Sequence, residues 1–322
     1  MVEPWHSCID TELSDVEKLM MSNLDSDNAE LTEMCRYVIG AGGKRLRPSL
    51  CILSYYMCGG KKPSIPIQIG SAFEIVHSAT LIHDDINDMG EIRRGRRTLH
   101  KAYTTSKAIV AGDYMFAIGF RLLADVAPQV VGYIVDASSS MGSGEFIQKD
   151  YEHAVNVTED EYVKIITGKT AKLFEAAAKS GAVVADEASM EKVDALGSFA
   201  YDLGLAFQIV DDTLDVTGDP NSTGKAVGTD LLEGKPTLPV IYAMQNPTLG
   251  KRVSELFEKP ETSLEDVKEA LSLIRATDAV SRCISKAKQF ASRACEHLAI
   301  FPDSIYKRSM LSLADYIVCR NR

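Results

Sequence analysis

The stretch FEIVHSATLIHDDIND, residues 73–88, joins a largely apolar run to three aspartates, and LGLAFQIVDDTLD, residues 203–215, repeats this arrangement. Each stretch predicts a helix that carries a carboxylate cluster near its end. On an α-helix, positions i and i+4 share a face and position i+1 borders it, so each cluster projects its carboxylates to one side. The aspartates are Asp84, Asp85 and Asp88 in the first stretch and Asp211, Asp212 and Asp215 in the second.

Crowded carboxylates repel one another, so an apolar interior would protonate some of them unless a cation shares their charge. Hard oxygen ligands that leave coordination sites for phosphate oxygens suit Mg²⁺. The alternative is a solvated acidic turn of helix. A solvated helix would carry polar residues around its outer face, whereas residues 73–83 and 203–210 are largely apolar. The sequence therefore favours acids that point into a cavity and bind several Mg²⁺ ions.

The composition is that of a folded protein: of 322 residues, 45% are hydrophobic and 25% are charged. A net charge of −10 argues against nonspecific nucleic-acid binding, which needs a basic excess. The seven cysteines show no C-x-x-C spacing and indicate reduced thiols. The N-terminal segment does not read as a secretion signal, and charged residues interrupt the longest apolar stretch, residues 109–134. We therefore expect a cytoplasmic protein without a transmembrane segment.

Helical periodicity runs through nearly the whole chain, which predicts an all-α fold. Residues 1–322 contain no repeat and no composition break, so we expect a single domain. Thr158 and Glu161 form a capping box for a helix that runs to about Ser180, with Gly181 just beyond its end. Further helices are expected at residues 189–216, 237–247, 264–275, 278–298 and 303–319.

Three connecting segments carry basic groups. GGKRLRP, residues 42–48, places three cations in a glycine-flanked turn before a helix N-terminus, where free N–H groups also favour an anion. The alternative for this segment is a solvated basic turn. RRGRR, residues 93–97, follows the first acidic cluster, so its cations could grip the same phosphate groups as the metals. Residues 218–236 carry Lys225 and Lys235 among glycines and could form a lid.

In order and spacing, these segments resemble the trans-isoprenyl diphosphate synthases, also called polyprenyl synthetases. The matching segments are GGKRLRP (42–48), HDDINDMGEIRRGRRTLH (83–100), GDY (112–114), GKTA (168–171), FQIVDDTLD (207–215), GK (224–225) and GKPTLP (234–239). The resemblance implies the all-helical isoprenoid synthase fold, usually in a homodimer, with the two aspartate motifs facing each other across a deep cavity. It also implies a prenyltransferase that condenses isopentenyl diphosphate with an allylic diphosphate, with three Mg²⁺ ions as cofactor.

The resemblance further implies roles for individual residues. The metal ligands would be Asp84, Asp85, Asp88, Asp211, Asp212 and Asp215. The allylic diphosphate would be held by Arg93, Lys169, Lys225 and Lys235. Isopentenyl diphosphate would be held by Lys44, Arg47, His77 and Arg94. Thr170 and Gln208 would lie near the reacting carbons, where a hydroxyl or amide dipole can face a transient cation. His77 taken alone would more often be a core histidine, so its role rests on the resemblance.

Product length should depend on the space for the growing tail. Thr80 lies one helical turn before Asp84, with Ala79 beside it, and both are small. In the family that this chain resembles, bulky aromatic residues at such positions accompany short products. Val76 lies a further turn away, and Phe116 and Phe120 form either a deeper floor or ordinary core packing. We expect a product longer than geranylgeranyl diphosphate, with geranylgeranyl diphosphate as the main alternative.

Two other function classes fit this sequence less well. A terpene cyclase shares the fold and the first acidic motif, but its second motif typically combines Asn or Asp with Ser or Thr and Glu. A noncatalytic partner subunit usually lacks one acidic motif or the basic turn, and this chain has both. The sequence leaves open the allylic primer, the number of condensations, the choice between homodimer and heteromer, and the pathway that the product serves.

Overall fold

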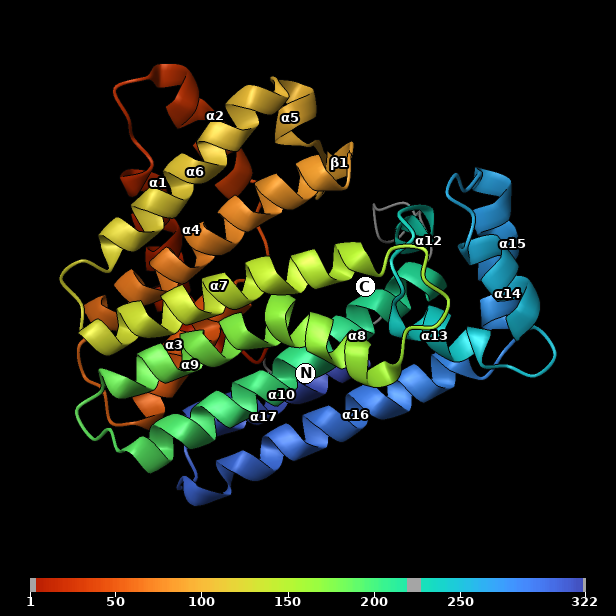
Figure 1. Cartoon of the computed structure of the whole chain (residues 1–322). Coiled ribbons are helices and arrows are strands. Elements are labelled where there is room, and N and C mark those ends of the chain that lie inside the picture. Colours follow the sequence, from red (N-terminus) through yellow and green to blue (C-terminus); the bar gives the residue numbers. More distant parts are fainter. Residues whose placement is uncertain (1–3, 219–226, 321–322) are drawn as a thin grey trace. The chain divides into compact units, whose positions relative to one another are not determined.

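The computed structural model describes residues 4–218 and 227–320, and these are helical almost throughout (Figure 1). Contacts divide the chain into two compact units, while its treatment as a single domain stays a prediction. The first unit comprises Met1–Asp136, Phe174–Gly197 and Leu298–Leu313. The second comprises Ala137–Leu173, Ser198–His297 and Ala314–Arg322. The all-α prediction is confirmed, with one short hairpin as an addition.

The first unit begins with a run of helices and contains the hairpin. Its elements are η1 (Ser7–Ile9), α1 (Asp10–Asn23), α2 (Ala29–Ile39), α3 (Leu46–Met57), α4 (Ser64–Asn87), β1 (Ile92–Arg93), β2 (Arg96–Arg97), α5 (Leu99–Ala102), α6 (Thr105–Leu122) and η3 (Leu298–Ile300). Four helices contribute residues to both units: α7 (Pro128–Asp150), α9 (Lys172–Val183), α10 (Met190–Thr217) and α17 (Ile305–Cys319). The second unit adds α8 (Glu159–Ile166), η2 (Thr167–Ala171), α12 (Thr229–Leu232), α13 (Leu238–Met244), α14 (Gly250–Phe257), α15 (Leu264–Arg275) and α16 (Ala279–His297).

Helix α4 forms the centre of the first unit. It packs against α1, α3 and α6, and α4 and α6 run side by side in Figure 1. Phe73 and Val76 are fully buried on it. Gly119 permits the close approach of α6, because a Cβ there would lie 2.5 Å from a methyl group of Val76. This packing fixes the direction of α4 and hence the position of the aspartates at its end.

The β-hairpin follows α4 directly. Ile92 pairs with Arg97 and Arg93 with Arg96 in antiparallel register. The two residues of the turn, Arg94 and Gly95, have φ values of 51° and 73°. Positive φ at both positions is the geometry of the tight turns that match the twist of a hairpin. The segment RRGRR, expected as an irregular connection, is therefore an ordered hairpin.

One boundary prediction was wrong. The capping box of Thr158 and Glu161 is present and begins α8. The helical segment, however, continues through η2 and α9 to Val183, so Gly181 lies inside α9 rather than beyond its end. A Cβ at Gly181 would lie 1.9 Å from the carbonyl oxygen of Cys51 on α3. This glycine therefore allows two helices to approach closely and does not terminate one.

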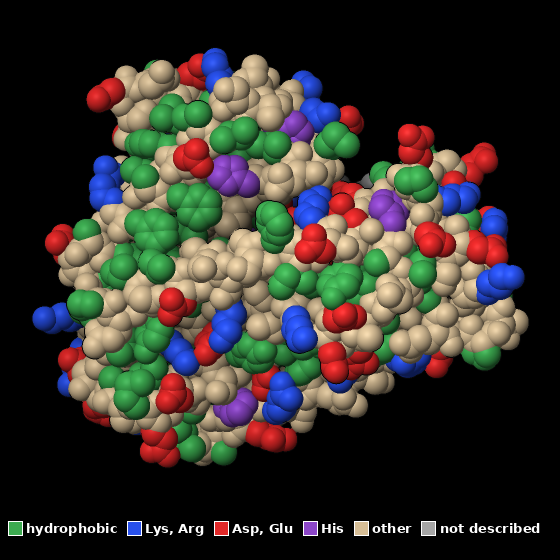
Figure 2. All heavy atoms as spheres, viewed as in Figure 1, with side chains coloured by type: hydrophobic (Ala, Val, Ile, Leu, Met, Phe, Trp, Pro, Cys, Tyr) green, Lys and Arg blue, Asp and Glu red, His purple; other side chains and the backbone are tan. Residues whose placement is uncertain are grey.

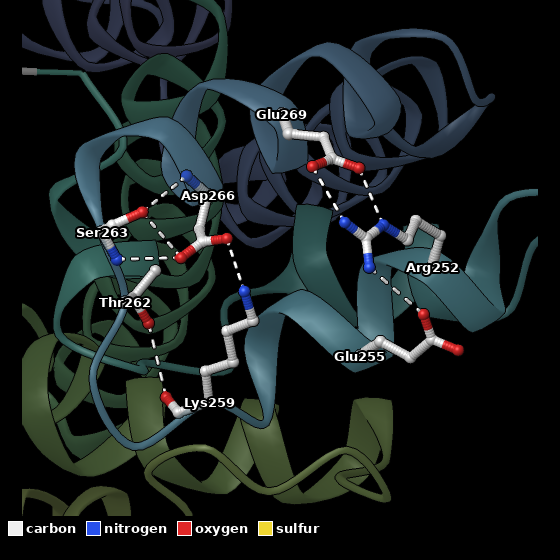
Figure 3. Close-up of polar contacts among 7 residues, drawn as sticks. All are labelled: Arg252, Glu255, Lys259, Thr262, Ser263, Asp266 and Glu269. Carbon is white, nitrogen blue, oxygen red and sulfur yellow. Dashed lines mark hydrogen bonds and ion pairs between the residues drawn. The ribbon is translucent and has the colours of Figure 1, made fainter.

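The later helices begin and end within a few residues of their predicted bounds, and α14 was not predicted. Figure 3 shows how α14 and α15 are joined by polar contacts. Arg252 donates to both carboxylate oxygens of Glu269, at 2.7 and 3.0 Å. Ser263 and Asp266 form a reciprocal capping box at the start of α15. These contacts are solvent-exposed and explain the local turn rather than the stability of the core.

Two helices, α4 and α10, are long and apolar enough to cross a membrane by length and composition alone. Within the protein, 72% of the apolar window of α4 and 67% of that of α10 are buried. Such burial is typical of the core helices of a folded protein.

Candidate active site

The first aspartate motif lies where α4 ends. Asp85 is buried, while Asp84 and Asp88 are half-buried. The Nε of Arg93, from strand β1, donates to Oδ1 of Asp85 at 2.5 Å. Burial raises the pKa of Asp85, and the neighbouring Arg93 opposes that rise. The motif thus offers carboxylates at a helix end with an arginine already placed on one of them.

The basic turn before α3 depends on unusual backbone angles. Gly42 and Gly43 have φ values of 77° and 151°, and Arg45 adopts the left-handed conformation at φ 48°. Lys44 is exposed, whereas Arg47 lies buried in the first turn of α3. The positive φ values allow the turn to reverse direction within a few residues.

The expected isopentenyl-diphosphate residues influence one another's pKa. Burial, against the opposing charge of Glu74 and with a smaller effect of Arg94, lowers the pKa of Arg47 to about 10. Burial and the charges of Arg47 and Arg94 hold the pKa of His77 well below its usual range, so this imidazole is neutral at pH 7. Arg94 also donates to the carbonyl oxygen of Gly42. The first unit therefore gathers four of the predicted binding residues, Lys44, Arg47, His77 and Arg94, around one basic turn.

A cluster of ion pairs around the buried Arg45 was not predicted. Arg45 Nη1 lies 3.0 Å from Oε1 of Glu74, and its Nε lies 2.5 Å from Glu17. Its Nη2 donates to the carbonyl oxygen of Ile39 at 3.0 Å. The guanidinium of Arg45 thus ties three helices to the turn, and this role left no signal in the sequence beyond the basic motif itself.

A pocket of about 120 Å³ opens within the second unit. The residues that line it include Gln148, Tyr162, Lys169, Gln208, Asp212, Asp230, Lys235 and Thr237. Residues Thr167–Ala171 form a single turn of π-helix between α8 and α9. Such turns are rare in proteins as a whole. Where they occur, they often lie at functional sites, because the extra residue changes the direction of the side chains. The expected residues Lys169 and Thr170 lie on this turn.

Asp212 is the most constrained carboxylate of the second motif. The hydroxyl of Tyr162 donates to its Oδ2 at 2.6 Å, and the amide of Gln208 donates to its Oδ1 at 2.8 Å. Thr170 in turn donates to the carbonyl oxygen of Gln208 at 2.7 Å. Burial and the charge of Asp230 nevertheless raise the pKa of Asp212 to about 7. These hydrogen bonds orient the carboxylate but do not fully compensate its negative charge.

Asp215 and Asp230 form a second pair of carboxylates. The backbone N–H groups of Thr229 and Asp230 donate to the two oxygens of Asp215, at 3.2 and 3.1 Å. Burial raises the pKa of Asp215 to about 6, and burial with the Asp215 charge raises that of Asp230 well above its usual range. Asp230 was missed by sequence reasoning, because it lies alone on a short helix after the motif.

Two of the expected lysines of the second unit contact carboxylates. Lys169 pairs with Glu145 at 2.5 Å and donates to Gln148 at 3.0 Å. Lys235 pairs with Glu233 at 2.6 Å. Lys225, and with it part of the proposed lid, lies outside the described residues. Within this unit the structure thus brings together Lys169, Thr170, Gln208, Asp212 and Lys235, with Asp211 and Asp215 on the same helix as Gln208.

The residues expected to control product length lie on α4 and α6 of the first unit. Val76 and Ala79 are fully buried, and Thr80 is half-buried and donates to the carbonyl oxygen of His77 at 2.7 Å. Phe116 and Phe120 are half-buried, and the ring of Phe116 stacks on His83 at 5.9 Å between centroids. Their role in product length stays a prediction.

The donor chemistry fits Mg²⁺. In the part of the chain that the structure describes, no three His, Cys, Asp or Glu side chains cluster closely enough to hold a metal by themselves. Mg²⁺ usually needs only one or two protein carboxylates, with water and phosphate oxygens completing its octahedron. Burial first, and the charges of neighbouring carboxylates after it, raise the pKa values of Asp212 and Asp215, so their ionised forms lack full compensation. A divalent cation is the partner that such carboxylates accept.

Comparison with known proteins decides the family. The polyprenyl synthetase family model matches residues 28–274. The chain belongs to the polyprenyl synthetase family. It is 34% identical to an all-trans-nonaprenyl-diphosphate synthase of Rhodobacter capsulatus, over 92% of this chain and 91% of that protein. It is 35% identical to a geranylgeranyl diphosphate synthase of Methanosarcina mazei, over 90% of each chain.

Solved structures agree on the fold. A polyprenyl synthase of Caulobacter crescentus, complexed with calcium and isoprenyl diphosphate, has 31% sequence identity and a TM-score of 0.95, covering 100% of this chain and 98% of that one. A decaprenyl diphosphate synthase of Rhodobacter capsulatus has 32% identity and a TM-score of 0.90, covering 99% and 98%. The predicted isoprenoid synthase fold and the resemblance to polyprenyl synthetases are confirmed.

Proposed function

We infer that this chain is a Mg²⁺-dependent prenyltransferase that condenses isopentenyl diphosphate with an allylic diphosphate to make a trans-polyprenyl diphosphate. The observation that carries this conclusion is Asp212, a carboxylate of the second motif held by Tyr162 and Gln208 beside Lys169 and Lys235 in one pocket. Family membership supplies the reaction class. The Caulobacter structure, with calcium and isoprenyl diphosphate, supports the need for a divalent cation and a diphosphate.

The chain's charged residues have separate tasks in this proposal. Arg93, Lys169, Lys225 and Lys235 hold the allylic diphosphate. Lys44, Arg47, His77 and Arg94 hold isopentenyl diphosphate, with His77 as a neutral donor. The six aspartates of the two motifs hold Mg²⁺, for which we propose three ions. When bound, Mg²⁺ supplies positive charge to the diphosphate that leaves.

The chemistry requires no protein nucleophile. The allylic carbon–oxygen bond breaks, the diphosphate leaves with the electron pair, and the double bond of isopentenyl diphosphate forms the new carbon–carbon bond. The departing diphosphate accepts one proton from the resulting cation, which restores a double bond and leaves the chain longer by one isoprene unit. The hydroxyl of Thr170 and the amide of Gln208, 2.7 Å apart, are suited to face the transient cation with their dipoles. Exclusion of water protects that cation from capture as an alcohol.

We propose that the product is longer than geranylgeranyl diphosphate. Relatives with names from geranylgeranyl to decaprenyl diphosphate synthase match at similar identity, so family membership alone does not fix the length. Support comes from the small side chains of Ala79 and Thr80, one turn before Asp84 on α4. Geranylgeranyl diphosphate remains the competing product, and Phe116 and Phe120 are the proposed deeper floor.

We also propose a homodimer, supported by an exposed apolar face on α6. Ile109 and Val110 expose 43% and 55% of their surface, and the exposed Ala117 follows two turns later on the same side. Figure 2 shows hydrophobic side chains gathered over α6. Apolar surface of this kind is frequent at interfaces between subunits. The cytoplasmic location stays a proposal, supported by the seven cysteines, which are all free thiols.

The decisive experiment is a product assay. Purified protein is incubated with labelled isopentenyl diphosphate, Mg²⁺ and one of three allylic primers, and the products are separated by chromatography. We expect labelled polyprenyl diphosphates that vanish in excess chelator and return when Mg²⁺ is added. Turnover that persists in excess chelator would overturn the metal assignment, and lack of product from every primer would overturn the proposed activity.

A further inference from the structure

A buried arginine follows the last described helix of the second unit. Arg320 comes directly after α17, and its side chain is only 3% exposed. Its Nη2 donates to the carbonyl oxygen of Phe207 at 2.9 Å and to Oδ1 of Asp211 at 3.3 Å. Its guanidinium carbon lies 4.2 Å from the centre of the Phe207 ring. Three separate contacts therefore hold this cation against α10 at the second aspartate motif.

These contacts compensate the buried charge incompletely. Burial lowers the pKa of Arg320, and the charge of Asp211 opposes that effect. The Nε of Arg320 is buried and has no hydrogen-bond partner among the described residues. A guanidinium has five N–H donors, and a purely structural buried arginine normally satisfies most of them. Hydrogen bonding alone therefore does not explain why a charged side chain is buried here. The neighbouring acidic motif does, because it supplies the opposite charge.

The first motif shows the same arrangement. Arg93 donates to Asp85 there at 2.5 Å, from eight residues further along the chain. Arg320 contacts Asp211 from 109 residues away. Each motif therefore has an arginine in contact with one of its carboxylates. Both Asp85 and Asp211 are among the carboxylates to which the proposed function assigns Mg²⁺.

We propose that Arg320 is a positioning residue and the internal counter-cation of the second motif. It orients Asp211 while metal is absent and weakens the binding of Mg²⁺ to the protein without diphosphate. The reason is electrostatic: a divalent ion on Asp211 must displace the guanidinium or bind beside its positive charge. This inference rests on the proposed function, because it assumes that Asp211 serves the metal.

The arrangement has a consequence for the order of binding. A diphosphate brings several negative charges, which can satisfy Arg320 and the metal at the same time. A metal ion that binds without diphosphate is repelled by Arg320, and no added negative charge offsets that repulsion. Mg²⁺ is therefore expected to bind tightly only together with a diphosphate, so the substrate-free enzyme does not hold a full set of ions. At about 6 Å in a water-like medium, repulsion between a unit charge and a divalent ion changes the affinity on the order of tenfold.

The test compares Arg320→Met with Arg320→Lys. The methionine keeps most of the packing over Phe207 and removes the charge, whereas the lysine keeps the charge and loses the planar fork. Arg308→Met is the matched control, because Arg308 lies on α17, the helix that precedes Arg320, in an exposed ion pair with Asp303. Calorimetric titration with Mg²⁺, without any diphosphate, gives the dissociation constant of each folded variant.

We expect Arg320→Met to bind Mg²⁺ about five- to tenfold more tightly than the unaltered protein. Arg320→Lys and Arg308→Met should stay within about twofold of it, because both keep the charge beside Asp211. The proposal is overturned if folded Arg320→Met binds Mg²⁺ with unchanged or weaker affinity. It is also overturned if neither the unaltered protein nor Arg320→Met binds Mg²⁺. If Arg320→Met fails to fold, Arg320→Gln takes its place in the same titration with the same criterion.

Failure of this inference can be told apart from failure of the proposed function. If the unaltered protein makes polyprenyl diphosphates with Mg²⁺ but the titrations do not differ, only the role of Arg320 is wrong. If the unaltered protein makes no such product with any primer, the proposed function is wrong whatever the titrations give. A merely structural arginine would lower the melting temperature of Arg320→Met and leave its affinity for Mg²⁺ unchanged.

Discussion

The two aspartate motifs share one sequence pattern but lie in different surroundings. In the first motif, Asp84 and Asp88 are half-buried at the end of α4, and a hairpin supplies Arg93 to the buried Asp85. In the second, Asp212 lies buried inside a network of donors, and its pKa rises to about 7. The same residues can thus have different proton affinities, because burial and neighbouring charges decide them. The second motif should therefore be the place where protons and metal compete.

Loss of one aspartate from either motif should have the largest effect. Asp84→Ala and Asp211→Ala should each lower kcat roughly 10²- to 10³-fold, since the metals act most strongly as charge develops on the leaving group. Steady-state kinetics with saturating substrates measures this loss. Asp186→Ala, an exposed aspartate in the loop before α10, is the control and should keep the full rate. A mild effect at one motif only would show that this motif does not serve the reaction.

Changes in the basic turn should act on binding rather than on rate. Lys44→Ala or Arg47→Ala should raise the KM for isopentenyl diphosphate roughly 10- to 100-fold with a smaller change in kcat, because each removes a hydrogen bond to a charged group. Initial rates at varied isopentenyl diphosphate and fixed primer give the two constants. A fall in kcat as large as that of the aspartate variants would contradict the separation of the two tasks.

The second motif should make the metal-free protein sensitive to pH. The pKa of Asp212 is about 7 in the folded protein, and about 4 is usual for an unfolded chain. The folded state therefore holds a proton that the unfolded chain releases, and this stabilisation is present below about pH 4 and lost as pH rises to about 7. Melting temperatures measured across this range should fall with pH, and Asp212→Asn should flatten that part of the curve.

Tyr162→Phe sharpens the same comparison. In the unaltered protein, the Tyr162 hydroxyl donates to Asp212 at 2.6 Å, and this hydrogen bond lowers the pKa of that carboxyl. The substitution removes the hydrogen bond. The pKa of Asp212 should rise further, so the pH at which Mg²⁺ activates the enzyme should move upward. Activity measured against pH at a fixed Mg²⁺ concentration reports this shift. An unchanged pH profile would show that Tyr162 does not influence the binding of Mg²⁺.

Substitutions in α4 before the first motif should change the length of the product without changing the binding of Mg²⁺. Ala79→Phe inserts a ring where the side chain is fully buried, and a close-packed wall has little room to relax. Products should become shorter while the first condensation stays active, as chromatography of the products will show. Phe116→Ala or Phe120→Ala should lengthen products if the ring is the deeper floor. If it is only core, stability should fall by about 3 to 5 kcal/mol at constant length.

The smallest effect is expected at the exposed N-terminal cap of α15, shown in Figure 3. Ser263→Ala removes the side chain that accepts a hydrogen bond from the backbone N–H of Asp266 at 3.1 Å. Loss of such a cap costs about 1 kcal/mol of unfolding free energy. Denaturant unfolding should show this change, while the product distribution and kcat stay unaltered. A loss of activity would mean that the α14–α15 hairpin influences the chemistry.

Local patterns predicted the features that depend on neighbours in sequence. The capping box of Thr158 and Glu161 and the aspartates at the helix ends follow from spacing alone. Contacts between distant residues left no such signal: Tyr162 contacts Asp212 from 50 residues away and Arg320 contacts Asp211 from 109. Gly181 shows the limit of a local rule, since a glycine can serve close packing as well as a helix end.

The central proposal is that both motifs serve the same prenyl transfer. The most direct test is a double-mutant cycle with Asp84→Asn, Asp211→Asn and the double variant, each assayed for single-turnover prenyl transfer with Mg²⁺. Residues that act as a unit give non-additive losses. We predict that the double variant is about as slow as the slower single variant. A double variant whose loss equals the product of the two single losses would show that the motifs act independently and would contradict the account.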